Sequence, residues 1–98
     1  MFKIWAKTVR GEKLTRNYLY YGEGEYTDER FEECIYDICN ELDIPSPVIM
    51  RTHVQNFEQF NHTVFRASDY VESIDFDRFT VEYCLDEKRP AKDLRFYP

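Results

Sequence analysis

The chain has only three glycines and three cysteines among 98 residues, and it has no long apolar run. Gly11, Gly22 and Gly24 match no phosphate-binding fingerprint, so a nucleotide-binding glycine loop is not expected. No segment approaches the roughly twenty apolar residues of a membrane span. Charged residues also interrupt the start of the chain too early for a secretory signal. These absences predict a cytoplasmic protein with no membrane partner.

The cysteines form no recognisable disulfide or metal pattern. Cys34 and Cys39 lie five positions apart on a predicted helix, where their side chains diverge too far to form a bridge or to chelate one ion. Their odd total favours free, mostly buried thiols in a reducing compartment. A small enzyme using Cys84 with His53 or His62, as thiol nucleophile or metal ligand, stays an alternative. The main expectation is a protein that is not an enzyme, with no metal and no cofactor.

The net charge of −6 is unevenly distributed. Basic residues gather in residues 1–20 and 88–98, and acidic residues gather in 21–45 and 67–87. Because an acidic protein repels phosphate at long range, nucleic acid is not the expected partner. The acidic segments leave open an alternative function as an inhibitor or nucleic-acid mimic.

Acidic residues also cluster just before the last predicted strand, at Glu72, Asp75 and Asp77. Paired carboxylates can bind Ca²⁺ or Mg²⁺ or act as general acids and bases. The spacing of a calcium-binding loop is absent here. A solvated entry to the strand, with Phe76 in the core, is the simpler interpretation.

One amphipathic helix is predicted over about residues 27–43. Its apolar residues recur at the spacing of a single helix face, namely Phe31, Cys34, Ile35, Ile38, Cys39 and Leu42. Thr27 is the expected N-cap, and its hydroxyl would accept a hydrogen bond from the first turn. Pro45 and Pro47 are expected to end the helix at Leu42 or Asp43.

Alternating segments predict the strands. Residues 2–9 and 14–21 read as a β-hairpin, and residues 79–85 read as the last strand. Between them we expect a short strand at 48–50, a brief helix or 3₁₀ turn at 54–60, and a short strand at 63–66.

These elements predict a single α+β domain over residues 1–87, followed by a charged tail at 88–98. The expected sheet is small, antiparallel or mixed, and contains the N-terminal hairpin and the C-terminal strand. The long amphipathic helix packs on one face of it.

The middle of the chain resembles a group of short uncharacterised bacterial proteins. The resemblance spans roughly residues 37–83 and rests on "DICNELDIPSPV" and "FEQFNHTVFRASDYVESIDFDRF". These segments give a helix, a proline-containing break, an F-x-x-F-x-x-T-x-F run and an acidic D-F-D entry to a strand. The resemblance implies a compact intracellular α+β domain and carries no activity, cofactor or catalytic residue.

The hairpin supplies a candidate interaction surface, formed by Trp5, Lys7, Arg16, Tyr18 and Tyr20. If one face of the sheet packs against the helix, some of these rings must face solvent. Exposed aromatic and basic side chains are typical of protein interfaces. We therefore expect a small binding or accessory module that acts through a sheet face or a strand edge. The expected partner is a protein, either a different one or a second copy of this chain.

Overall fold

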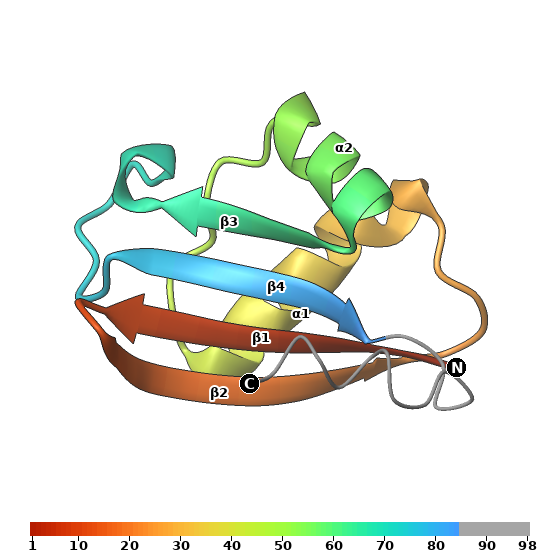
Figure 1. Cartoon of the computed structure of the whole chain (residues 1–98), viewed down its shortest axis with the longest axis horizontal. Helices are drawn as coiled ribbons and strands as arrows, with labels where there is room; N and C mark the ends of the chain where they lie inside the picture. The colour runs from red at the N-terminus through yellow and green to blue at the C-terminus, as the bar shows by residue number, and fades with distance from the viewer. Residues whose placement is uncertain (85–98) are drawn as a thin grey trace.

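The computed structural model describes residues 1–84, and they form a four-stranded antiparallel sheet accompanied by two helices. The strand order is β2-β1-β4-β3. In chain order the elements are β1 (Phe2–Arg10), β2 (Lys13–Gly22), α1 (Phe31–Leu42), α2 (Arg51–Phe60), β3 (His62–Arg66) and β4 (Arg78–Cys84). As Figure 1 shows, α1 crosses one face of the sheet, whereas α2 lies alongside β3. The α+β class and the antiparallel sheet are as predicted. The predicted tail at 88–98 lies outside the described residues, as does the end of the predicted domain.

The predicted hairpin is confirmed. Phe2, Ile4 and Ala6 of β1 are buried on the face toward α1, because alternate side chains of a strand point to the same side. Gly11 sits in the connecting turn at φ 63°, a conformation that glycine adopts without steric cost.

The beginning of α1 differs from the prediction. A short 3₁₀ turn at Asp28–Arg30 comes first, and α1 starts only at Phe31. Thr27 makes no side-chain capping bond, so the predicted hydroxyl cap is wrong. Its carbonyl oxygen instead accepts a hydrogen bond from the N–H of Arg30 at 2.9 Å. The tighter 3₁₀ turn satisfies the main chain at this end of the helix without a side chain.

The end of α1 is where the sequence placed it. Asp43 follows Leu42 in the left-handed conformation, with φ 58°, and the N–H of Ile44 donates to the carbonyl of Cys39 at 3.0 Å. This left-handed residue turns the chain out of the helix before Pro45 is reached.

The second helix is longer than predicted. The sequence predicted one long helix and only a brief helix or 3₁₀ turn at 54–60, whereas α2 has ten residues and starts at Arg51. Residues 48–50, predicted as a strand, are irregular, and the side chains of Val48 and Met50 are exposed. The apolar stripe of α2 is short, with only His53 and Phe57 buried, so tertiary packing rather than periodicity decides this helix.

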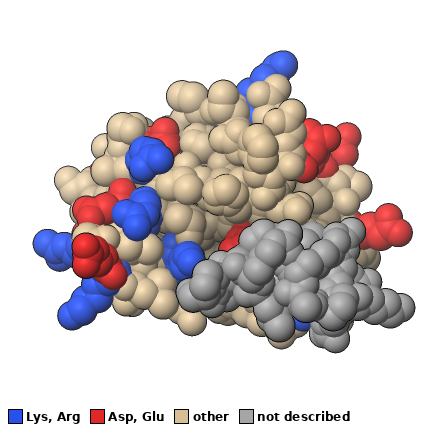
Figure 2. Space-filling model, in the orientation of Figure 1, with Lys and Arg blue, Asp and Glu red and all other residues tan. Residues whose placement is uncertain are grey.

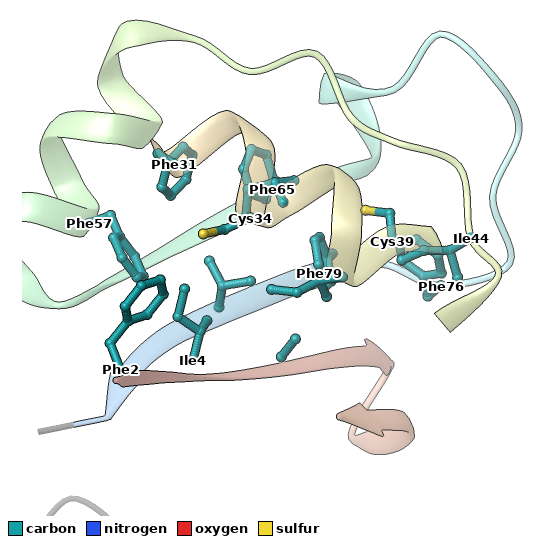
Figure 3. Close-up of a cluster of buried hydrophobic side chains, with 14 residues drawn as sticks. Phe2, Ile4, Phe31, Cys34, Cys39, Ile44, Phe57, Phe65, Phe76 and Phe79 are labelled. Carbon is teal, nitrogen blue, oxygen red and sulfur yellow. The ribbon is translucent and has the colours of Figure 1, made fainter. Parts of the chain in front are cut away.

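The core lies between α1 and the inner face of the sheet, and Figure 3 shows its side chains pointing toward one another from both layers. Aromatic rings dominate one end. Phe57 joins α2 to this core, with its ring centroid 5.2 Å from that of Phe31. Phe65 of β3 lies 5.8 Å from Phe79 of β4. Tilted and stacked ring pairs of this kind add to the free energy gained by burying their area.

Candidate functional site: a groove at the β3 edge

The five residues of the predicted interaction surface do not share one face. Trp5 and Lys7 lie on the outer face, away from α1, where the Nζ of Lys7 is 4.2 Å from the centre of the Trp5 ring. Tyr18 and Tyr20 pair with Ala6 and Ile4, which places them on the inner face.

The inner-face residues have partners near α1 and the loop before β4. The Tyr20 hydroxyl donates to Asp37 Oδ2 of α1 at 3.0 Å. Arg16 pairs across the strand with Thr8 and holds both carboxylate oxygens of Asp75, at 3.2 and 3.1 Å. The alternation of the sequence correctly placed Tyr18 and Tyr20 on one face of β2, but it did not show which face the helix covers.

The cysteines are free, as predicted. Burial raises the pKa of Cys34 and of Cys39 to about 11. Burial, and then the carboxylate of Glu82, raise the pKa of Cys84. Because the thiolate is the reactive form, these three environments disfavour nucleophilic chemistry at neutral pH.

The acidic residues before β4 are occupied within the protein. Arg16 lowers the pKa of Asp75 by hydrogen bonding, and the Asp77 carboxylate accepts a hydrogen bond from the N–H of Gly11. Across residues 1–84, no three His, Cys, Asp or Glu side chains are grouped so that they could hold a metal ion. No helix in the same range is long and apolar enough to cross a bilayer.

One edge of the sheet presents unpaired main chain. β3 is the last strand in the order, so only β4 pairs with it. The N–H of Tyr83 donates to the carbonyl of Asn61, and the register continues through Thr63 opposite Val81. Main-chain groups alternate in direction along a strand. The N–H and C=O groups of His62 and Val64 therefore point away from β4, toward the open edge of the sheet.

The open stretch of this edge is short. The next outward N–H, that of Arg66, donates to Asp69 Oδ2 at 2.9 Å. On β3, the outward donors that stay open are therefore those of His62 and Val64. Natural proteins commonly keep edge strands short to avoid unwanted pairing, so a short open edge does not by itself define a binding site.

A groove of about 480 Å³ lies between α2 and β3, next to the open edge. Phe60, which is 61% exposed, stands at the α2 side of this groove. Thr63 lies against it from the sheet and is only 2% exposed, yet its hydroxyl has no hydrogen-bond partner in the described part of the chain. The lining residues are Thr52, His53, Asn56, Phe60, His62, Thr63, Val64, Arg66, Ser68 and Asp69.

His53 holds the start of α2 in place beside this groove. The main-chain N–H of Met50 donates to His53 Nδ1 at 2.9 Å, so Nε2 carries the proton and faces Asp69 Oδ2 at 3.3 Å. The ring also lies 4.3 Å from that of Phe65. Since both ring nitrogens are engaged and the residue is 7% exposed, His53 braces the groove and is not available as a free base.

The outer side of the β3 edge is basic. Arg66 is exposed and makes no side-chain ion pair within the described residues, and Arg78 lies directly across from it on β4. Lys7 lies on the same outer face, opposite Thr80. In Figure 2, Lys and Arg side chains gather toward the end of the sheet where β3 ends and β4 begins, with Asp and Glu side chains among them. Like charges directly across a ladder repel, so this region favours an added negative group.

The opposite edge, β2, is built differently. By the same alternation, Leu19 and Tyr21 present their main chain outward, and both side chains are exposed. The register of β2 shifts where Thr8 pairs with Arg16 and Val9 pairs with Leu14, which leaves Thr15 unpaired as a β-bulge. A bulge increases the local twist and interrupts regular pairing with another strand.

No known protein family matches this sequence, and neither curated proteins nor solved structures show significant similarity to the chain.

The sequence did not reveal the groove. It predicted the strand at 63–66 and a turn of helix before it, and it named a strand edge as one place for binding. The F-x-x-F-x-x-T-x-F run was the available signal, because it contains Phe60 and Thr63. Nothing in the pattern indicated that α2 would lie alongside the outer edge of β3.

Proposed function

We propose that this protein is a binding module that captures an extended peptide segment on the edge of β3. The segment would add a fifth strand to the sheet and lie in the groove beside α2. The observation that carries the proposal is the open main chain of His62 and Val64 at the floor of this groove. Strand addition of this kind obtains affinity from main-chain hydrogen bonds and specificity from side-chain pockets.

The neighbouring residues support a bound peptide. Phe60 supplies an exposed aromatic side chain of the type that anchors interfaces. The unpaired hydroxyl of Thr63 can accept or donate one hydrogen bond. The brace between His53 and Asp69 keeps α2 in position, so little ordering cost arises on the protein side.

A different polypeptide fits this edge better than a second copy does. In a symmetric antiparallel pair centred on Val64, each Arg66 would lie opposite His62 of the other copy. No acidic side chain of β3 would compensate, because the strand reads HTVFR. Self-association through β3 is therefore disfavoured.

The test uses a synthetic peptide of about eight residues that alternates Val with Thr, long enough to cover the five residues of β3. Binding is followed by NMR titration. Val64→Pro removes one outward N–H without breaking a bond to β4, and edge strands tolerate proline. We expect binding to weaken about tenfold or more, because one lost hydrogen bond and one unpaired carbonyl together cost at least ~1.4 kcal/mol.

Leu19→Pro on the β2 edge is the matched control, because it removes an equivalent outward N–H far from the groove. It should leave affinity unchanged, and both variants should keep the melting temperature within a few degrees. A version of the peptide with methylated main-chain nitrogens should not bind. Equal weakening by both prolines would refute the site. A sedimentation mass that drops in Val64→Pro would instead identify the occupant as a second copy.

Phe60→Ala provides a second variant that does not touch the strand. Because Phe60 is mostly exposed, its removal should lower affinity while changing the free energy of unfolding little. Tyr36→Ala, at an exposed aromatic residue on α1, is its control and should leave binding unchanged.

A further inference from the structure

We infer that the segment bound at the β3 edge is acidic, with a carboxylate side chain placed opposite Arg66. This inference rests on the proposed function and adds the chemistry of the partner. It follows from the charges around the groove and from the alternation of an added strand.

The positive side chains at this edge have no carboxylate partner in residues 1–84. Arg66 and Arg78 lie opposite one another on the outer face, and no ion pair joins either of them to an acid. Among the described residues, the only acid that lines the groove is Asp69, which already accepts from His53 Nε2 and from the N–H of Arg66. An added carboxylate would therefore meet an uncompensated guanidinium pair and form charge-assisted hydrogen bonds with it.

The geometry of the ladder fixes where that carboxylate must stand. His62, Val64 and Arg66 all point their side chains to the outer face, since they alternate with buried Thr63 and Phe65. Every second residue of an added strand lies on the same face, next to these three. The intervening residues point toward α2, where Asn56 and Phe60 line the groove. The recognised pattern is thus an acid opposite Arg66, alternating with uncharged residues that face the helix.

The test compares three peptides of about eight residues that alternate Val with Glu, Thr or Lys. We expect affinity to fall in the order Glu, Thr, Lys, with Glu about tenfold or more above Lys at low salt and a smaller ratio at high salt. The net charge of −6 would by itself produce the opposite order. Arg66→Glu should reverse the preference between Glu and Lys and leave the Thr peptide nearly unaffected.

Arg51→Glu is the matched control, because Arg51 is also exposed but does not line the groove. It should preserve the order of the three peptides. Arg66→Gln, which removes the charge and keeps a polar side chain, should abolish the preference for Glu over Lys. Equal binding of all three peptides would overturn the inference and leave the groove intact. Failure of all three peptides to bind would instead overturn the proposed function. Equal effects of Arg66→Glu and Arg51→Glu on the order of the peptides would refute the placement of the carboxylate opposite Arg66.

Discussion

Individual residues of this protein are fixed by close contacts that the sequence does not display. Gly22, at the end of β2, pairs with Phe2, and its backbone lies against the Phe2 ring. A Cβ atom at position 22 would overlap that ring. The glycine is required here by space, because its φ is ordinary, whereas Gly11 is required by its positive φ.

Gly22→Ala should therefore lower the free energy of unfolding by ~1–3 kcal/mol, the usual cost of overpacking. Urea denaturation measures the change. Replacing Phe2 with Leu in the same chain should make the alanine less harmful, because the flat ring is gone. Glu23→Ala, at the exposed neighbouring position, should be nearly neutral. A neutral Gly22→Ala would contradict the close approach.

The sequence predicted correctly which side chains of one strand share a face. It did not predict which face they occupy, because that depends on the register between strands. The alternation with a period of two correctly placed Tyr18 and Tyr20 on the same face of β2. Whether they face α1 or solvent depends on the pairing of β1 with β2, and that pairing places Tyr20 within hydrogen-bond reach of Asp37. Because this information is held in a neighbouring strand, periodicity within β2 alone could not supply it.

At the scale of elements, α1 was predictable because five of its side chains form a buried stripe, namely Phe31, Cys34, Ile35, Ile38 and Cys39. The second helix was predicted too short, since it buries only His53 and Phe57. Its stability comes from Phe57 packing on Phe31 and from the hydrogen bond that the Met50 N–H donates to His53 Nδ1, which are tertiary and capping contacts.

The buried thiols of α1 give this element a pH dependence. Burial raises the pKa of Cys34 and Cys39 from an ordinary 9.0 to about 11. Above pH 9 the unfolded chain therefore loses these protons before the folded chain does, so the stability contributed below pH 9 is lost as the pH rises toward 11. Denaturation of Cys39→Ala across this range should show a smaller alkaline loss than the natural sequence.

Ile38→Val is the control for that prediction, because it also shortens a buried side chain of α1 but removes no titrating group. It should lower stability at every pH and leave the alkaline slope unchanged. An unchanged slope in Cys39→Ala would show that this thiol ionises as freely in the folded protein as in the unfolded chain.

At the scale of the whole molecule, the two edges of the sheet differ. The β2 edge carries a bulge at Thr15, whereas the β3 edge presents open main chain next to a helix-lined groove. Arg66 and Arg78 add positive charge beside that groove in a protein whose net charge is −6. The alternating segments of the sequence predicted the sheet. They could not predict the groove, because this depends on how α2 packs against the outermost strand.

The most direct test of strand addition is amide hydrogen exchange at His62 and Val64, measured with and without the peptide that alternates Val with Glu. In the free protein both outward N–H groups should exchange quickly. At saturation, exchange at both positions should slow about tenfold or more, while exchange at Leu19 and Tyr21 on β2 should not change. Binding without protection at His62 and Val64, or with protection only along β2, would contradict strand addition at β3.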